Sequence, residues 1–338
     1  MLKKNSTFII AEAGINHNGN FDTAKKLIAS AKDCGADAIK FQAYKTENLI
    51  IKEARKAGHV KGKQSFFEML KSWELSEKDY VDLSYYAEKI GIIFFASVFD
   101  GQSLALMEKI GAPLHKIASC DLNNFKLLKE AAGTRKPIIF SVGLGDLVEI
   151  RQAVKILEKN NNELAILHCV SLYPPEPQEL NLQRIGVLAR KFPCQIIGYS
   201  DHTLDIFVPA ASVLLGARIV EKHFTLDKKM PGPDQPSSAN PTEFRKMVEE
   251  IRYFEKAINF KEKSIAPLSR ERAMRKAFRR SLVAGRPITK GAKISEDMLA
   301  AKRPGIGIPP SEINLIAGKR AKIDIPENAL IKYSDLIR

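Results

Sequence analysis

Two histidines stand at the ends of apolar segments that have the composition of buried β-strands. His202 ends the segment Ile196–His202, and His223 lies near the end of Arg218–Thr225. If these segments are neighbouring parallel strands, about 5 Å apart, both imidazoles can reach one metal ion. Two histidines leave coordination positions open for water and substrate, which is typical of a catalytic metal site. The pattern therefore predicts that His202 and His223 bind a catalytic metal.

Two lysines lie inside apolar segments, where a charge is costly to bury without a partner. Lys40 belongs to Ala36–Gln42 and Lys116 to Pro113–Ser119. Several serines stand at or just after the ends of such segments: Ser97, Ser119, Ser141, Ser171 and Ser200. Lysines and hydroxyls gathered at one place predict a pocket for phosphate and carboxylate groups. The alternative is that the lysines only form structural ion pairs, with Glu12 or Glu221.

These residues need a scaffold that brings strand ends together. Short apolar segments without strict alternation are typical of strands buried on both faces. Eight are expected, at Phe8–Ala13, Ala36–Gln42, Ile92–Ser97, Pro113–Ser119, Pro137–Gly143, Leu164–Val170, Ile196–His202 and Arg218–Thr225. Amphipathic helical stretches alternate with them, so the sequence predicts an α/β fold, a (β/α)₈ TIM barrel, whose catalytic face lies at the carboxyl ends of its strands. An open doubly wound sheet is the alternative, but no GxGxxG follows the first strand.

The chain is expected to divide into a barrel over residues 1–262, a basic linker over 263–277 and a small β-rich module over 278–338. Pro and Gly interrupt the short strand-like pieces of that last part, Ser281–Ala284 and Leu330–Lys332. Within the barrel, Lys45–Trp73 is the longest irregular connection, and a loop of this length often lies over an active site.

Three further reactive side chains are given structural roles. His168 is interpreted as a core histidine, and Cys120 and Cys169 as small buried residues rather than nucleophiles. No two of the four cysteines form a CxxC pair, so we expect no disulfide framework and a reducing cytoplasm.

The formal net charge is +14 over 338 residues. Lys and Arg are spread along the chain, which disfavours nucleic-acid binding and favours a basic surface that suits anionic substrates. No apolar run approaches the roughly 20 residues of a membrane span, and the first residues lack the layout of a signal peptide. We therefore expect neither a membrane nor a nucleic-acid partner.

Five segments, taken together, are specific for one family. They are Ile9–Gly19 (IIAEAGINHNG), Gly35–Gln42 (GADAIKFQ), Gly198–Thr203 (GYSDHT), Glu221–Asp227 (EKHFTLD) with Gly232–Asp234, and Lys302–Gly307 (KRPGIG). The chain resembles the N-acetylneuraminate (sialic acid) synthase family, which includes the legionaminic and pseudaminic acid synthases. The motifs run in family order through both expected domains.

The resemblance implies a TIM barrel followed by an antifreeze-like (SAF, β-clip) domain, and a homodimer in which that domain is swapped over the partner's active site. It implies that His202 and His223 bind Mn²⁺ or Mg²⁺, and that Glu12 and Asp234 are acidic residues near the reacting centre. The implied phosphoenolpyruvate site is Lys40, Ser97, Lys116, Ser119, Ser141, Ser171 and Ser200. The implied sugar site is Gln42, Asp121, Tyr173 and Arg303.

The implied activity is a transferase reaction that condenses phosphoenolpyruvate with an N-acetylmannosamine-like sugar to give a nonulosonic acid and phosphate. Departures from the family pattern at Val98, Asp121, Val142 and Ser171 leave the sugar open, including a 6-phosphorylated one. Two alternatives remain: another phosphoenolpyruvate-dependent synthase of 3-deoxy sugar acids, and an inactive carbohydrate-binding barrel.

Overall fold

A computed structural model describes residues 6–56, 64–160, 162–258 and 265–337. It divides into two compact units, Met1–Lys261 and Glu262–Arg338. The expected boundary at 262/263 lies outside the described residues. The stretch expected as a linker contains a helix, α11 (Ser269–Phe278), which belongs to the second unit.

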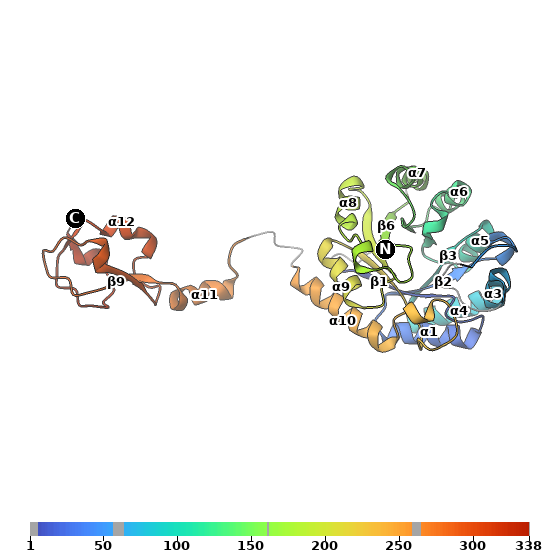
Figure 1. Cartoon of the computed structure of the whole chain (residues 1–338), viewed down its shortest axis with the longest axis horizontal. Helices are drawn as coiled ribbons and strands as arrows, with labels where there is room; N and C mark the ends of the chain where they lie inside the picture. Colours follow the sequence, from blue (N-terminus) through green and yellow to red (C-terminus); the bar gives the residue numbers. More distant parts are fainter. Residues whose placement is uncertain (1–5, 57–63, 161, 259–264, 338) are drawn as a thin grey trace. The chain divides into compact units, whose positions relative to one another are not determined.

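The first unit is a closed parallel barrel of eight strands in sequence order, with helices around it (Figure 1). The strands are β1 (Phe8–Gly14), β2 (Ala38–Ala43), β3 (Ile93–Val98), β4 (His115–Ile117), β5 (Ile138–Ser141), β6 (Leu164–Cys169), β7 (Ile196–Asp201) and β8 (Ile219–His223). The predicted TIM barrel is therefore confirmed, and β8 closes it by pairing with β1.

The expected bounds of all eight strands are correct to within two residues at each end, and the fourth strand is shorter than expected at both ends. There, β4 covers only three residues, and Ser119 lies beyond it in a 3₁₀ turn, Ser119–Asp121. The apolar side chains of the strands are almost fully buried, which explains their continuous apolar composition. Because side chains alternate in direction along a strand, Lys40 and Gln42 share one face of β2.

Helices separate the strands, and the residues that cap them can be recognised in the sequence. The helices of the barrel unit are α1 (Phe21–Asp33), α2 (Thr46–Leu49), α3 (Phe66–Trp73), α4 (Glu77–Ile90), α5 (Gly101–Lys109), α6 (Phe125–Gly133), α7 (Leu147–Leu157), α8 (Arg184–Lys191), α9 (Phe207–Ser212) and α10 (Pro241–Ala257). Ser76 and Asp79 form a capping box at α4, and Gly91 ends that helix in the left-handed conformation.

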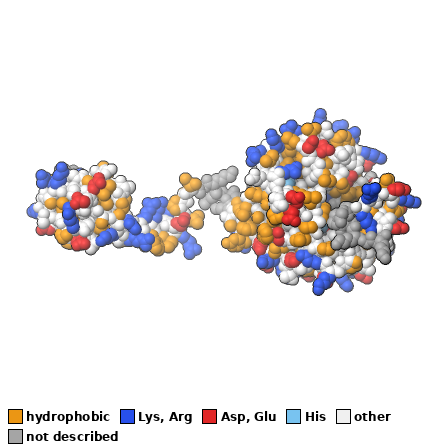
Figure 2. All heavy atoms as spheres, in the orientation of Figure 1, with side chains coloured by type: hydrophobic (Ala, Val, Ile, Leu, Met, Phe, Trp, Pro, Cys, Tyr) orange, Lys and Arg blue, Asp and Glu red, His pale blue; other side chains and the backbone are white. Residues whose placement is uncertain are grey.

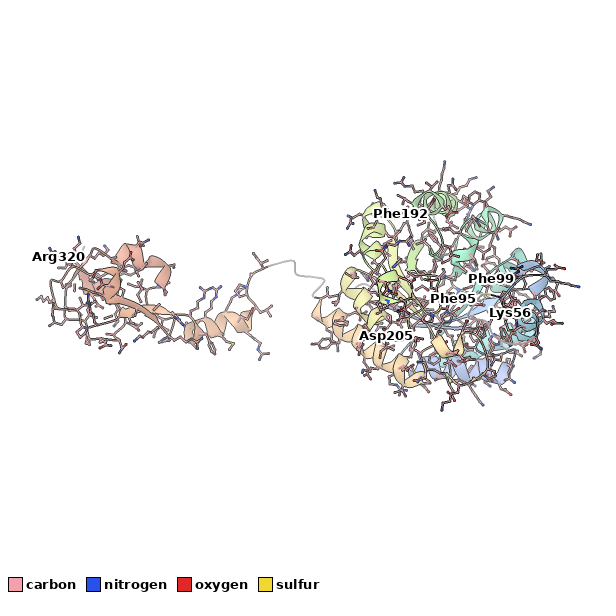
Figure 3. The ribbon with its side chains drawn as sticks, in the orientation of Figure 1. Lys56, Phe95, Phe99, Phe192, Asp205 and Arg320 are labelled. Atoms are coloured by element: carbon pink, nitrogen blue, oxygen red, sulfur yellow. The ribbon has the colours of Figure 1, made fainter. Side chains whose placement is uncertain are left out.

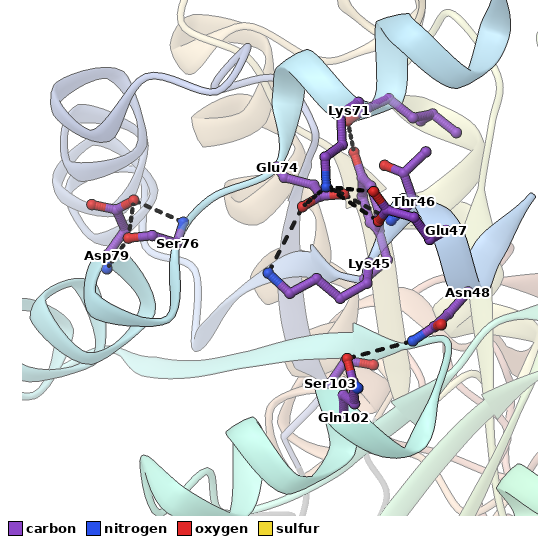
Figure 4. Close-up of polar contacts among 12 residues, drawn as sticks. Lys45, Thr46, Glu47, Asn48, Lys71, Glu74, Ser76, Asp79, Gln102 and Ser103 are labelled. Carbon is purple, nitrogen blue, oxygen red and sulfur yellow. Dashed lines mark hydrogen bonds and ion pairs between the residues drawn. The ribbon is translucent and has the colours of Figure 1, made fainter.

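The connection Lys45–Trp73 was expected to be irregular, but its described residues include two short helices, α2 and α3. An ion-pair network holds them together (Figure 4). Lys71 Nζ lies 2.9 Å from Glu47 Oε1 and 3.2 Å from Glu74 Oε2. Thr46 N also donates to Glu74 Oε1, at 2.7 Å. The capping box of α3 and these ion pairs thus stabilise two short helices that lack a long apolar repeat.

The second unit has its own small apolar core. It contains α11, α12 (Ile313–Ile316) and four short strands: β9 (Ser281–Ala284), β10 (Leu299–Lys302), β11 (Arg320–Ala321) and β12 (Leu336–Ile337). β9 pairs antiparallel with β10, and Leu330 forms a single bridge to Val283 rather than the expected strand. The core includes Leu282, Ile294 and Ile331.

The last features of the fold concern the distribution of basic side chains on the surface and the length of the apolar helices. Figure 2 shows Lys and Arg side chains scattered over the visible face of the barrel unit rather than collected in one patch. No helix among the described residues is long and apolar enough to cross a membrane.

Candidate active site

The carboxyl ends of the barrel strands surround a cavity of about 730 Å³. Most side chains expected to act lie in its wall: Glu12, Lys40, Gln42, Ser97, Lys116, Ser119, Ser141, Ser171, Tyr173, Ser200, His202 and His223. The cavity thus combines residues from all eight strands or the turns that follow them, which is the usual place of a barrel active site.

Lys40 stands at the centre of a buried charge cluster. Its Nζ lies 3.1 Å from Glu12 Oε2 and 3.2 Å from Glu221 Oε2. It also donates to Ser97 Oγ, at 3.0 Å. The structural pairing that sequence analysis left open is therefore present, and both carboxylates take part in it.

Lys116 is buried, and no carboxylate among the described residues forms an ion pair with it. Its Nζ donates to Ser141 Oγ at 2.8 Å and to the carbonyl oxygen of Ile117 at 3.1 Å. Burial lowers the pKa of this ammonium, although the negative charge of Glu221 opposes the shift. A buried cation held by neutral groups gains most from an anionic ligand, so Lys116 is the stronger anion-binding candidate of the two lysines.

The two buried glutamates differ in protonation. Burial raises the pKa of Glu12 to about 7, against the opposing effect of Lys40. Burial acts on Glu221 in the same direction, but Lys116 and Lys40 outweigh it and lower the pKa of Glu221 to about 2. Carboxyl pairs whose pKa values are pushed apart are typical of sites that transfer protons. Glu12 can therefore exchange a proton near neutral pH while Glu221 stays ionised.

The two histidines lie side by side, with ring centroids 5.4 Å apart. Tyr173 stacks on His202 at 4.0 Å and meets His223 edge-on at 5.8 Å. Asp234 Oδ2 lies 3.8 Å from His223 Nδ1. This aromatic pair with an adjacent carboxylate occupies the side of the cavity formed by β7 and β8.

The donor set of these rings fits a divalent cation. His202 Nδ1 lies 2.7 Å from the carbonyl oxygen of Val170, which can only accept, so Nδ1 carries a hydrogen, and in the neutral ring Nε2 has a lone pair. The buried Nδ1 of His223 has no hydrogen-bond partner among the described residues. Within those residues no three His, Cys, Asp or Glu side chains form a preassembled metal cluster, so water or substrate would complete the coordination.

The first βα turn brings further polar groups together. Gln42 Nε2 donates to Glu12 Oε1, at 3.2 Å. A Cβ atom at Gly14, which has φ +52°, would lie 3.3 Å from both of these atoms and 3.7 Å from Asp234 Oδ2. Gly14 therefore allows the three side chains to converge beside the cavity, and Asp234 joins the site although it does not line the cavity wall.

Two expected sugar-site residues lie elsewhere in the structure. Asp121 is in the 3₁₀ turn after β4, where its Oδ1 accepts from Asn124 Nδ2 at 3.0 Å, and it does not line the cavity. Arg303 belongs to the second unit, where its guanidinium lies 5.1 Å from the ring centroid of Phe278. Their roles toward a sugar remain predictions.

Of the three other reactive side chains that were expected to be buried, two are buried. His168 is buried, and its Nε2 lies 2.8 Å from the carbonyl oxygen of Leu180. Cys169 is buried, but it lines the cavity 3.8 Å from His202 Nδ1. Cys120 is exposed, not buried, because it lies in the short turn beyond β4.

Sequence reasoning missed the apolar part of the cavity wall. Phe99, Leu144, Leu172 and Pro174 line it, together with the carboxylate of Glu179. Phe99 follows β3, where it is labelled in Figure 3. Single apolar residues in loops carry no periodic signal, so only the fold could reveal them.

A closed parallel barrel with ionisable side chains converging at its carboxyl ends has the layout of a (β/α)₈-barrel enzyme. Residues 27–263 match the model of the NeuB family, and residues 279–337 match that of the SAF domain. The chain therefore belongs to the NeuB family, and the expected SAF domain is confirmed.

Relatives with assigned activities cover nearly the whole chain. It is 41% identical to the N,N'-diacetyllegionaminic acid synthase of Legionella pneumophila, over 97% of this chain and 94% of that protein. It is 35% identical to the N-acetylneuraminate-9-phosphate synthase of Mus musculus, over 96% of this chain and 91% of that protein. Among solved structures it is similar to the sialic acid synthetase of Leptospira borgpetersenii in complex with citrate, with TM-score 0.74 and 36% identity over 80% of this chain and 91% of that one.

Proposed function

We propose that this protein condenses phosphoenolpyruvate with the aldehyde of an open-chain N-acetylmannosamine-like sugar, releasing a nonulosonic acid and phosphate. The observation that carries the proposal is the set of buried charged side chains in the cavity wall, which we call the cavity floor. There, Lys40 forms an ion pair with Glu12, a carboxyl that can take up a proton, and Lys116 is buried without an ion pair to any described carboxylate. The family relationship supports the same reaction class.

Phosphoenolpyruvate carries a phosphate and a carboxylate, and the floor offers donors for both. Lys116 and Ser141 already share a hydrogen bond, and Gly143 N donates to Ser119 Oγ at 3.0 Å. These groups are ready to exchange their mutual contacts for ligand oxygens. An anion held here would lie in the same cavity as the histidine pair, and holding both substrates together removes much of the entropic barrier to their reaction.

The proposed reaction consumes one phosphoenolpyruvate, one sugar aldehyde and one water. C3 of phosphoenolpyruvate forms a bond to the aldehyde carbon, and the aldehyde oxygen takes a proton. The hydroxyl of one water adds to C2, the C2–O bond to phosphate breaks, and the added hydroxyl becomes the keto oxygen as its proton passes to the leaving phosphate. Glu12, with its pKa near 7, would accept a proton from the attacking water and pass it to the former aldehyde oxygen.

His202 and His223 are the residues that would hold the divalent cation, Mn²⁺ or Mg²⁺. Once bound, such an ion supplies Lewis-acid polarisation of the aldehyde oxygen. Tyr173, stacked on His202, would fix the ring plane and exclude water from that side.

We also propose that the protein is a domain-swapped homodimer in which Arg303 of the partner subunit's SAF domain contacts the sugar. The support is that Leu144 and Leu172 at the cavity mouth are 76% and 46% exposed in the single chain. Exposed apolar side chains around a mouth gain free energy when another surface covers them.

The test is phosphate release from phosphoenolpyruvate with N-acetylmannosamine or arabinose 5-phosphate as acceptor. We expect release of phosphate only when N-acetylmannosamine is present, and a product whose mass equals the sum of both substrates plus water minus phosphate. Turnover of arabinose 5-phosphate instead would assign the protein to the other class of 3-deoxy sugar acid synthases. A Lys116→Met variant is the matched control for contaminating activity, since it should lose the release.

A further inference from the structure

The segment that follows β8 leaves the barrel and returns to it before α10. Backbone hydrogen bonds hold its two ends together: Thr225 N donates to the carbonyl oxygen of Ala239 at 3.0 Å, and Ala239 N donates to that of His223 at 2.8 Å. Residues 226–238, between these ends, carry Asp234 and have little regular structure beyond the 3₁₀ turn Gln235–Ser237. Side-chain contacts must therefore fix the place of Asp234.

Ser238, in this segment, links the backbone of Asp234 to the first βα turn. Its Oγ donates to the carbonyl oxygen of Asp234 at 2.7 Å and accepts from Asn16 Nδ2 at 2.9 Å. Asn16 Nδ2 also donates to the carbonyl oxygen of Phe224, at 2.9 Å. Asn16 thus uses both hydrogens of its amide to hold the segment beside the end of β8.

Gln235 forms a second link between the same two parts of the chain. Its Nε2 donates to the carbonyl oxygen of Asn16 at 3.0 Å, and its Oε1 accepts from Thr225 Oγ1. A further hydrogen bond runs from Asn18 Nδ2 to the carbonyl oxygen of Pro231, at 2.7 Å. The first βα turn and the segment after β8 are therefore tied together at several places.

Four of these polar side chains are buried, and we call them the polar clamp: Asn16, Thr225, Gln235 and Ser238. Asn16 and Ser238 are each 1% exposed, and the other two are 0% exposed. A buried polar group is unfavourable without a hydrogen-bond partner, so these contacts favour a single arrangement of the chain. Apolar side chains could fill the same space, but they would not tie the carbonyl oxygen of Asp234 to a donor.

The side chain of Asp234 reaches the active site from this fixed backbone. Its Oδ2 lies 3.8 Å from His223 Nδ1, and a Cβ at Gly14 would lie 3.7 Å from the same oxygen. The carbonyl oxygen of Asp234 accepts from Ser237 N at 3.1 Å as well as from Ser238 Oγ. The position of such a group matters, because a displacement of about 1 Å can lower a rate about 10²-fold.

We propose that Ser238, Asn16 and Gln235 are positioning residues that act on the reaction through Asp234. This inference rests on the proposed function, and it gives a role in the reaction to side chains that do not line the cavity. Ser238 fixes the backbone of Asp234 directly. Asn16 and Gln235 hold the segment against the first βα turn, which also carries Gly14.

The experiment measures kcat/KM with phosphoenolpyruvate and N-acetylmannosamine in Ser238→Ala. We expect a loss of roughly ten- to a hundredfold, because the backbone of Asp234 is no longer tied to the clamp. The same substitution in an Asp234→Ala background should change kcat/KM by less than about twofold, since Ser238 then has no carboxylate to position. An equal loss in both backgrounds, or no loss in the single variant, would overturn the inference.

Ser212→Ala is the matched control. Ser212 of α9 is also fully buried, and its Oγ donates to the carbonyl oxygen of Pro209 at 2.6 Å. The substitution removes the same kind of hydrogen bond without touching the segment after β8, so kcat/KM should stay as in the unmodified protein. A loss in this control as large as that of Ser238→Ala would show general destabilisation, and would overturn the assignment.

A crystal structure of Ser238→Ala gives a readout that does not depend on activity. We expect the Asp234 carboxylate to leave its place 3.8 Å from His223 Nδ1, while the barrel strands keep their positions. A carboxylate that stays in place would overturn the inference even if kcat/KM fell. Lack of turnover by the unmodified protein would instead overturn the proposed function, and with it the role of the clamp in that reaction.

Discussion

The buried ion pair between Lys222 and Asp201 joins the two strands that carry the histidine pair. Lys222 Nζ lies 2.6 Å from Asp201 Oδ2, and the two side chains are 1% and 0% exposed. Asp201 also accepts from Tyr199 Oη and Thr203 Oγ1, each at 2.8 Å. Each member of the pair directly precedes a histidine, so the pair fixes the register in which His202 and His223 face the cavity.

Lys222→Met is the perturbation that tests this network. It leaves the buried Asp201 carboxylate with two hydroxyl donors and no counter-charge. Removing one partner of a buried ion pair lowers the free energy of unfolding by about 3–5 kcal/mol. Because two hydroxyl groups still donate to Asp201, we expect a loss near the lower limit, about 3 kcal/mol. For a domain of this size, that loss corresponds to a melting temperature lower by about 6–12 °C.

The assay is urea and thermal unfolding followed by circular dichroism, with Lys78→Met as control. Lys78 Nζ lies 2.5 Å from Asp82 Oδ2, but these side chains are 83% and 44% exposed. Water screens that pair, so its loss should leave the free energy of unfolding nearly unchanged. Adding Asp201→Asn to Lys222→Met should recover about 1–2 kcal/mol, because no unpaired charge then stays buried. A loss below about 1 kcal/mol for Lys222→Met would refute the reasoning.

Four further predictions concern the reaction. The kcat/KM should rise with pH through about 7 as Glu12 loses its proton. Glu12→Gln should remove this rise of kcat/KM with pH and lower the rate about 10²-fold or more. A rise that the variant keeps would contradict the assignment, since Glu221, with its pKa near 2, is already ionised at that pH. Lys116→Met should weaken phosphoenolpyruvate binding at least about tenfold in calorimetry, and equal affinity would exclude Lys116 from the anion site. Arg303→Ala should raise KM for the sugar far more than KM for phosphoenolpyruvate, and two unchanged constants would exclude the SAF domain from the site. His223→Ala should abolish metal-dependent turnover, whereas undiminished turnover would remove the metal assignment.

The barrel could be predicted because its strands are buried on both faces. That burial requires continuous apolar segments. An amphipathic helical stretch follows each of them after a short connection, as in a (β/α)₈ barrel. The side chains that end the strands could therefore be assigned to one face before their contacts were known. Lys40 and His223 illustrate this: both lie in the cavity wall as expected.

The sequence could not predict the residue at which each strand ends or the direction of the side chains just beyond it. The fourth strand ends at Ile117, two residues before the expected end, so Asp121 turns away into a 3₁₀ segment and Cys120 becomes exposed. Side chains alternate in direction along a strand but not in a 3₁₀ turn, and sequence periodicity does not fix the residue at which one changes to the other. Similarly, that Lys40 binds two carboxylates at once follows from the pairing of β1 with both β2 and β8.

The apolar mouth was missed for a related reason. Leu144 lies in a turn between two glycines and has a φ of +65°, and Ser171 and Leu122 approach the flanking glycines closely. Such a conformation is a property of the assembled barrel. Local sequence preferences favour glycine there and give no sign that a leucine side chain lines the cavity.

The most direct test of the site is anomalous diffraction from crystals grown with Mn²⁺ and phosphoenolpyruvate. The proposed function predicts one manganese peak between the rings of His202 and His223, with the phosphate and carboxylate of phosphoenolpyruvate held by Lys40 and Lys116. Manganese bound away from the two histidines, or phosphoenolpyruvate bound away from the lysines, would contradict it.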